Sequence, residues 1–191
     1  MIKGNFKHCK DLAQFNKEIR ILHETDDGRS THGPGYCNHH DEIKRLAPEC
    51  KSYRELGVMQ GATSACAAVA GILDQQLIDI EDYQWTPYKH LWDDFEGLKY
   101  VYHKKSSLTP QMINLPNVDM MLSDSYHNYD HVIKELKLHA QTVNKYIIFH
   151  DTSLPDDRVY RAVTDFCMTN SAWQVIRRDE NSVGFTTIKR I

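Results

Sequence analysis

Short apolar runs recur along the chain from about residue 50 onward, and each is followed by a segment with helical periodicity. Such alternation is typical of a parallel sheet whose two faces are covered by helices. The pattern therefore predicts five strands, at residues 53–56, 76–80, 100–103, 118–122 and 146–149.

Apolar residues at helical spacing predict a helix after each of these strands. The first, residues 63–73, is rich in alanine, and Thr86-Pro87 and Thr109-Pro110 each combine an N-cap with a first-turn proline. In three helices, the first of which begins at Thr86-Pro87, the apolar residues share one face; they are Tyr88, Leu91, Trp92 and Phe95, then Tyr129, Val132, Ile133, Leu136, Ala140 and Val143, and finally Val159, Val163, Phe166 and Cys167. Runs at 173–178 and 183–188 flank a turn and predict a C-terminal antiparallel hairpin.

The first 49 residues are polar and irregular, in contrast to the rest of the chain. Helical spacing is confined to residues 12–22 and to Ile43 and Leu46. We interpret residues 1–49 as a helical extension or lid and residues 50–191 as the main domain, with a flexible loop as the alternative for the extension. The run 37–41 contains His39 and His40, but its spacing matches no established zinc pattern, so we expect no zinc there. As part of a lid, either histidine could reach a substrate.

Bulk composition narrows the class of protein. The chain has 191 residues, a formal charge of −3, and no apolar run near the roughly 18 residues of a membrane span. No sustained basic stripe is present, which makes a nucleic-acid partner unlikely. Five cysteines without a C-x-x-C pair argue against a disulfide framework, and the first residues lack the apolar segment of a signal peptide. We expect a single-domain cytoplasmic protein that does not bind membranes.

A glycine-containing turn follows the first predicted strand. Glu55, Gly57, Gly61 and Ser64 lie where that strand passes into a helix. Gly57 permits a backbone conformation closed to other residues, Gly61 allows close approach of a ligand, and Ser64 lies near outward-pointing helix N–H groups. The pattern predicts a nucleotide-cofactor turn, and an ordinary tight strand-to-helix turn is the alternative.

The order of these elements, together with two motifs, resembles the class I S-adenosylmethionine-dependent methyltransferases. Residues 118–129 contain D-x-x-H-x-Y and are followed by Glu135-Leu136, and His150-Asp151-Thr152 ends the fifth strand. These motifs resemble the small-molecule branch that includes catechol O-methyltransferase, cephalosporin hydroxylase and macrolide-sugar O-methyltransferases. The resemblance covers about residues 50–190. It implies an α/β fold with a Rossmann-like, doubly wound, mostly parallel seven-stranded sheet, and S-adenosylmethionine as cofactor.

The resemblance also implies a cofactor site at the strand ends. Glu55 would meet the cationic amino-acid end of the cofactor, with Gly57, Gly61 and Ser64 beside it. Asp79 follows Gly57 by 22 positions, near the spacing at which an acid reaches ribose hydroxyls, and Glu81 competes for that role. The acid that often follows strand three is replaced by residues 103–107, so we expect Ser106 to contact the adenine.

The same resemblance implies a metal site beside the cofactor. Asp124 and Asp151 end strands four and five, whose tips meet in a doubly wound sheet, and His150 is the expected third ligand for Mg²⁺ or Mn²⁺. His127 is the expected general base, with Asp124 beside it in the catalytic machinery. The alternatives are loop capping by the two acids and ordinary buried histidines.

Together these expectations indicate a metal-assisted O-methyltransferase for a small hydroxylated substrate, such as a sugar or a metabolite. An inactive methyltransferase-fold protein that binds a nucleoside as a regulator or partner subunit is the main alternative. It is motivated by the missing acid and by Ser125, which replaces a glycine common in the related motif. A third is a different reaction at the same metal site. Small members of such families often pair, so a homodimer is a further expectation.

Overall fold

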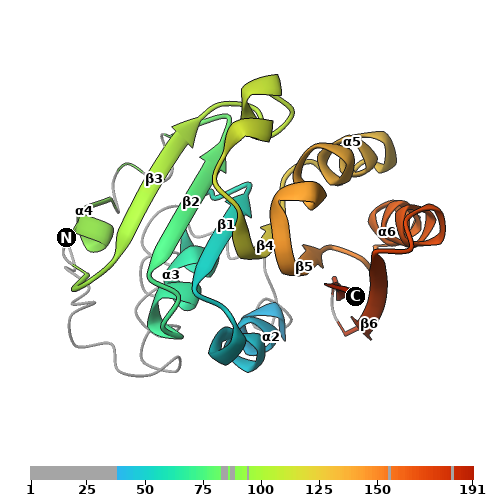
Figure 1. Ribbon diagram of the computed structural model, residues 1–191, viewed down its shortest axis with the longest axis horizontal. Coiled ribbons are helices and arrows are strands. Elements are labelled where there is room, and N and C mark those ends of the chain that lie inside the picture. Colours follow the sequence, from blue (N-terminus) through green and yellow to red (C-terminus); the bar gives the residue numbers. More distant parts are fainter. Residues whose placement is uncertain (1–37, 83–85, 87–88, 94, 155, 182) are drawn as a thin grey trace, which may run out of the picture.

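A seven-stranded sheet forms the centre of the molecule, with strand order β3-β2-β1-β4-β5-β7-β6 (Figure 1). The structure is a computed structural model that describes residues 38–191 apart from 83–85, 87–88, 94, 155 and 182. Strands β1 to β5 run parallel, and β7 is antiparallel to both β5 and β6. The strands are β1 Ser52–Leu56, β2 Asp74–Asp79, β3 Lys99–Lys104, β4 Val118–Ser123, β5 Val143–His150, β6 Trp173–Asp179 and β7 Phe185–Arg190. The predicted fold class is therefore confirmed.

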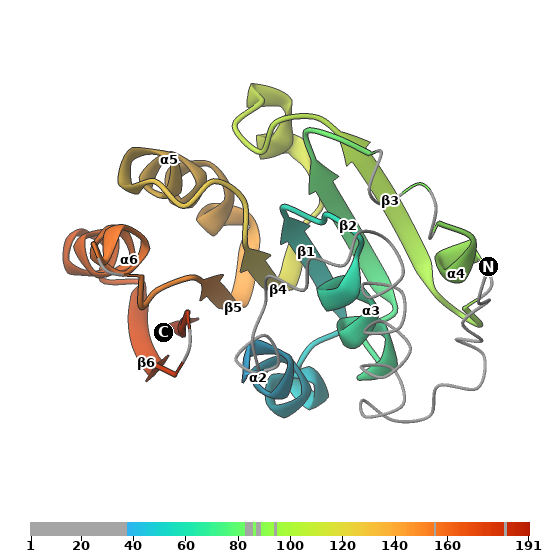
Figure 2. The same cartoon turned by 180° about the vertical axis from the view of Figure 1, so that it is seen from behind.

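Helices cover both faces of this sheet (Figure 2). On one face lie α2 (Asn38–Leu46), α3 (Ala62–Val69) and α4 (Lys89–Asp93), with the short 3₁₀ helix η3 (Ala47–Glu49) after α2. On the other lie η5 (Pro110–Asn114), α5 (Tyr129–His139), η6 (Ala140–Thr142) and α6 (Arg158–Thr169). Each face has its own apolar core, because alternate strand residues point to opposite sides. Representative residues are Ile43, Ala65, Leu77, Leu122 and Ile148 on the first face, and Ile78, Met121, Leu136, Ile147 and Val163 on the second.

Two predicted helices end earlier than their apolar pattern indicates. The alanine-rich helix stops at Val69, because Gly71 takes a left-handed conformation (φ +97°) and the chain turns into β2. Val143, placed by periodicity on the face of the helix before it, is the first residue of β5 and pairs with Val118. A left-handed glycine therefore ends the first helix, and pairing with the sheet outweighs the local helical pattern at Val143.

Helix α2 is fastened to the C-terminal hairpin by a buried carboxylate. Glu42 accepts hydrogen bonds from Arg45 and, across more than 130 residues of sequence, from Arg177 at 2.8 Å and Thr187 at 3.0 Å. Ile43 and Leu46 enter the core beside it. The predicted helix at 12–22 lies outside the described residues, and the domain boundary at 49/50 stays a prediction. No helix within the described ranges combines the length and the apolar character needed to cross a bilayer.

The register of the sheet sets several strand ends level. Leu56 of β1 pairs with Ile78 of β2 and with Ser123 of β4, and Ser123 pairs with Phe149 of β5. The residues that follow these four positions are Gly57, Asp79, Asp124 and His150. One edge of the sheet therefore gathers the residues that the sequence singles out.

Candidate functional site

A cavity of about 840 Å³ opens at the carboxyl ends of the parallel strands. Its walls come from the turns after β1, β2, β3, β4 and β5. Open α/β sheets bind ligands in this position, outside the carboxyl ends of their strands. The cavity is lined by most of the predicted site residues, namely Glu55, Gly57, Asp79, Ser106, Asp124, His127, His150 and Asp151.

The turn after β1 packs tightly against the turn after β4. Gly57 has φ +84°, and a Cβ atom there would overlap the carbonyl group of Asp124 and lie 2.8 Å from the Cα of Ser125. The amide of Asp124 donates to the carbonyl of Leu56 at 2.9 Å. Gly57 is therefore required for two reasons, its left-handed backbone and the contact between the two turns.

Gly61 and Ser64 form the start of α3 and do not appear in the cavity wall. Gly61 is the N-cap residue, with φ +85°, and the fully buried Ser64 donates from its hydroxyl to the carbonyl of Gly61 at 3.0 Å. Ala62 and Thr63, between them, do line the cavity. Of the four residues predicted for this turn, the structure places Glu55 and Gly57 at the cavity and the other two beneath it.

Glu55 is an almost completely buried carboxyl group at the end of β1. It is 2% exposed and accepts a hydrogen bond from the hydroxyl of Tyr53 at 3.0 Å. Burial raises its pKa well above the usual value, the Tyr53 hydrogen bond works in the opposite direction, and the charge of Asp124 adds to the rise. Burial therefore favours the neutral form of this carboxyl group, and a nearby positive charge would favour the ionised form.

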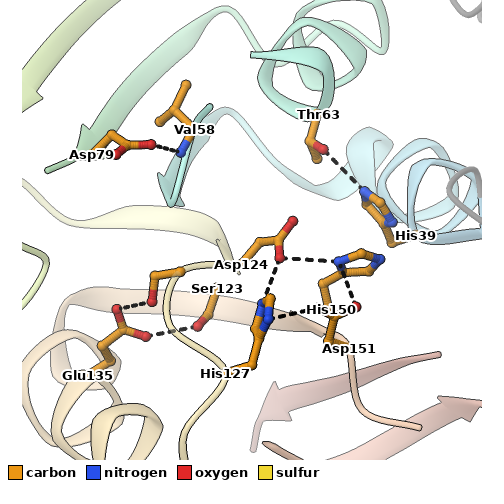
Figure 3. Close-up of polar contacts among 11 residues, drawn as sticks. His39, Val58, Thr63, Asp79, Ser123, Asp124, His127, Glu135, His150 and Asp151 are labelled. Atoms are coloured by element: carbon orange, nitrogen blue, oxygen red, sulfur yellow. Dashed lines mark hydrogen bonds and ion pairs between the residues drawn. The ribbon is translucent and has the colours of Figure 1, made fainter. Parts of the chain in front are cut away.

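Asp79 lies at the end of β2 and organises the first turn. Its Oδ2 accepts hydrogen bonds from the amides of Val58 at 2.8 Å and Met59 at 2.9 Å, as Figure 3 shows for Val58. Its Oδ1 accepts from the amide of Glu81 at 3.1 Å. Asp79 lines the cavity and Glu81 does not, which favours Asp79 for the predicted contact with a sugar hydroxyl.

Ser106 lies at the far end of the cavity, after β3. Its hydroxyl oxygen accepts from the amide of Leu108 at 3.2 Å, and the neighbouring Ser107 and His131 complete this wall. The hydroxyl of Ser107 lies 3.4 Å from Nε2 of His131. The wall after β3 therefore presents two serine hydroxyls and an imidazole, at the place where the related enzymes often have an acidic residue.

Four charged or titratable side chains meet at the ends of β4 and β5 (Figure 3). His127 lies between the two acids, with Nε2 at 3.0 Å from Asp124 Oδ1 and Nδ1 at 2.8 Å from Asp151 Oδ2. His150 Nδ1 lies 3.1 Å from the same Asp124 oxygen and 3.4 Å from Asp151 Oδ1. Asp151 has φ +58°, a conformation that aspartate tolerates better than most residues.

One atom from each of Asp124, His127 and Asp151 lies within 4.8 Å of the others, a spacing that could hold a metal ion. The sequence analysis predicts His150 as the third metal ligand and His127 as the general base. In the structure, however, the histidine that lies close enough to both acids to share a metal with them is His127. His150 lies beside the trio. Its Nε2 atom is buried and has no hydrogen-bond partner within the described part of the chain.

The pKa values of these acids and histidines are set mainly by their contacts with one another. Burial lowers the pKa of His127, but hydrogen bonds and charge from Asp124 and Asp151 outweigh burial and raise it to about 10. Burial would raise the pKa of Asp124, but His150 and His127 hold it below its usual value. Near neutral pH, His127 is therefore an imidazolium between two carboxylates, and it cannot take up a proton in that state.

Helix α2 adds two histidines, His39 and His40, to the surroundings of the site. The sequence analysis predicts them there only if residues 1–49 form a lid. Nε2 of His39 and of His40 lie 3.1 and 3.3 Å from the hydroxyl of Thr63, and the His39 and His150 rings are 4.6 Å apart. Burial lowers the pKa of both, that of His40 to about 4, so the two rings are neutral. Their position depends on the packing of α2, which no local sequence signal reveals.

Solved structures with the same fold include several methyltransferases. An O-methyltransferase from Bacillus cereus in complex with SAH (S-adenosylhomocysteine) is 9% identical, with a TM-score of 0.71 over 95% of this chain and 92% of that chain. A candidate O-methyltransferase from Klebsiella pneumoniae is 12% identical, with a TM-score of 0.68 over 100% and 92%. The SAH-bound methyltransferase PaMTH1 from Podospora anserina is 11% identical, with a TM-score of 0.60 over 95% and 97%.

The two comparisons by sequence found no match. No family model matches the chain, and a search of curated proteins found no match. At identities of 9–12%, similarity between structures concerns the fold alone. The strand order and these similarities together show that the chain has the fold of the class I S-adenosylmethionine-dependent O-methyltransferases.

Proposed function

We propose that this protein is an S-adenosylmethionine-dependent O-methyltransferase that acts on a small hydroxylated molecule with the help of a divalent metal. The observation that carries the proposal is a shared cavity, which joins Glu55 and Asp79 to Asp124, His127 and Asp151. A methyl donor and a hydroxyl acceptor must lie side by side, in line, for the transfer. A cavity of about 840 Å³ has room for both.

The residues at the β1 and β2 ends fit the cofactor chemically. The neutral, buried carboxyl group of Glu55 would ionise beside the ammonium of the methionine part, because an opposite charge favours the ionised form. Asp79 would accept from a ribose hydroxyl through Oδ1, since Oδ2 already accepts from two amides and Oδ1 from only one. Ser106 would face the adenine end.

The residues at the β4 and β5 ends fit a divalent cation. Asp124 and Asp151 would supply oxygen ligands and His127 a nitrogen, a mixed set that suits Mn²⁺ better than Mg²⁺. The ion would lower the pKa of the acceptor hydroxyl and fix its direction. His127 must lose its proton before it can bind a cation or serve as the base, whereas His150, outside the trio, can keep its contact with Asp124.

The cavity wall on the acceptor side is chemically mixed. It combines Thr63, His150 and the aromatic Tyr126 with the apolar Leu154 and Val183. Such a mixture suits a ring that carries hydroxyl groups, as in a sugar or an aromatic metabolite. The cytoplasmic location and the homodimer stay predictions.

A nucleoside-binding protein without methyl transfer is the second candidate, and the wall after β3 is the observation that favours it. Ser106, Ser107 and His131 stand there in place of an acid. Binding of the cofactor product without transfer to any acceptor would support this candidate.

Calorimetry with S-adenosylmethionine and its product, with and without Mn²⁺ or Mg²⁺, tests the proposal. We expect micromolar binding of both nucleosides and metal-dependent methylation within a panel of catechols and sugars. A protein that binds neither nucleoside at millimolar concentration would contradict the proposal. Binding of metal and nucleoside without methyl transfer would instead indicate another reaction at this site or the non-catalytic role.

A further inference from the structure

A second buried carboxylate, Glu135 of α5, lies beneath the loop that carries Asp124. Its side chain is 1% exposed and accepts hydrogen bonds from the hydroxyls of Ser123 at 3.0 Å and Ser125 at 2.6 Å. Figure 3 shows the carboxylate reaching from the helix to the end of β4. Nε2 of His131, one turn earlier in the same helix, lies 3.2 Å from it.

The two serines are the immediate neighbours of Asp124 in the sequence. Both are tied to one carboxylate, so the backbone of Asp124 is held on the α5 side by Glu135. On the opposite side it is held by Gly57, whose turn touches the Asp124 carbonyl group, and by the hydrogen bond to Leu56. Asp124 itself points away from Glu135, toward His127 and His150.

Glu135 is suited to this task because it is ionised. Burial raises the pKa of the carboxyl group, but the hydrogen bonds from His131, Ser107 and Ser125 outweigh burial and lower the pKa below its usual value. A carboxylate accepts several donors at once, and hydrogen bonds to a charged acceptor are shorter and stronger than neutral ones.

We propose that Glu135 is a positioning residue that fixes Asp124 for metal binding by holding the hydroxyls of Ser123 and Ser125. The inference rests on the metal site of the proposed function and gives a role to Ser125, which stands where related motifs have glycine. Through His131, which lines the cavity, the same carboxylate also fixes part of the wall after β3.

The test compares Glu135→Gln with Glu42→Gln, a matched change of another buried carboxylate that accepts several donors away from the cavity. Mn²⁺ affinity is measured by electron paramagnetic resonance at a temperature well below the melting point of every variant. Loss of a residue that orients a metal ligand typically weakens metal binding about 10- to 100-fold, and we expect that range for Glu135→Gln. Glu42→Gln should bind Mn²⁺ within about twofold of the unaltered protein.

A Ser125→Ala variant and the double variant with Glu135→Gln complete a double-mutant cycle. If the two residues act as one unit, the double variant should lose little more Mn²⁺ affinity than Glu135→Gln alone. Equal loss in Glu135→Gln and Glu42→Gln, or no loss in either, would overturn the proposal.

Hydrogen exchange separates this inference from the metal proposal itself. In Glu135→Gln, amides of residues 123–128 should exchange faster, while those of residues 146–149 keep their rate. If the unaltered protein binds no Mn²⁺, the metal part of the proposed function fails. The role of Glu135 is then decided by exchange, and unchanged exchange at residues 123–128 would refute it.

Discussion

The two ends of the cavity handle charge in opposite ways. At the β1 end, burial raises the pKa of Glu55, whose hydrogen-bond partner is the neutral hydroxyl of Tyr53. At the β4 and β5 ends, Asp124 has a lowered pKa because two imidazoles lie within 3.1 Å of it. The first end lacks a cation of its own, whereas the second already contains one in His127. Binding of a ligand ammonium would release the proton of Glu55, whereas a metal would have to displace a proton from His127, between Asp124 and Asp151.

Removal of an acid at the β4 or β5 end should have the largest effect on activity. Asp124→Ala and Asp151→Ala each delete a candidate oxygen ligand, and we expect metal-dependent methyl transfer to fall by at least about 100-fold. Initial rates at saturating cofactor measure the change. Asp130→Ala, at an exposed acid of α5, is the matched control and should keep its rate. Normal rates in both cavity variants would mean that the metal assignment is wrong.

Gly57→Ala should disturb both ends together, because its turn touches the turn of Asp124. We expect the free energy of unfolding to drop by on the order of 3 to 5 kcal/mol, measured by urea denaturation. Gly71→Ala shares a positive φ but meets nothing within 4 Å, so it should cost only about 1 to 2 kcal/mol. Equal decreases in the free energy of unfolding for the two variants would show that the contact with Asp124 does not contribute to stability.

The raised pKa of Glu55 predicts a pH dependence that is specific to the β1 end. A carboxyl group with a raised folded-state pKa stabilises the fold fully below its unfolded pKa, and this contribution is lost as pH rises through the folded value. Glu55→Gln should therefore make unfolding less dependent on pH above about 4.5. Denaturation midpoints across pH 5–9 measure this.

The same variant should weaken cofactor binding by about tenfold, since the amide cannot pair with an ammonium group. In the unaltered protein, affinity should rise with pH until Glu55 is ionised before the cofactor arrives. Calorimetry at several pH values measures both effects. A pH-independent affinity in the unaltered protein would place the ammonium group elsewhere.

The smallest effect is expected at the end of β2. Asp79→Asn keeps an oxygen for the amides of Val58 and Met59 but puts a donor in place of the oxygen that accepts from Glu81, so cofactor affinity should fall by about fivefold. Glu81→Gln, two residues later and outside the cavity, should leave affinity unchanged. If Glu81→Gln weakened cofactor binding and Asp79→Asn did not, Glu81 would be the residue that contacts the ribose.

Much of the fold could be predicted because its signals are local. Alternating strands and helices and a final hairpin leave few arrangements, and parallel strands of similar length bring Asp124 and Asp151 to one edge. One error arose after Val69, where the left-handed Gly71 ends the helix, and the other at Val143, where sheet pairing takes over.

Residues whose role depends on distant packing could not be predicted in the same way. Arg54 is completely buried, and its guanidinium donates to Gln76, Thr142 and the carbonyl of Pro116, none of which is near it in sequence. A charged residue in a strand is normally placed at the surface from sequence. Likewise, nothing in the sequence near Glu135 predicts its hydrogen bonds to Ser123 and Ser125.

The attachment of α2 has a consequence for how such a protein can diversify. The helix reaches His150 and Thr63 from outside the five strand–helix units, and Glu42 fastens it to the last hairpin. Mutations that reshape α2 would therefore alter one wall of the cavity, at Thr63 and His150. In a lineage with this architecture, changes in one peripheral helix could alter which molecules the cavity accepts.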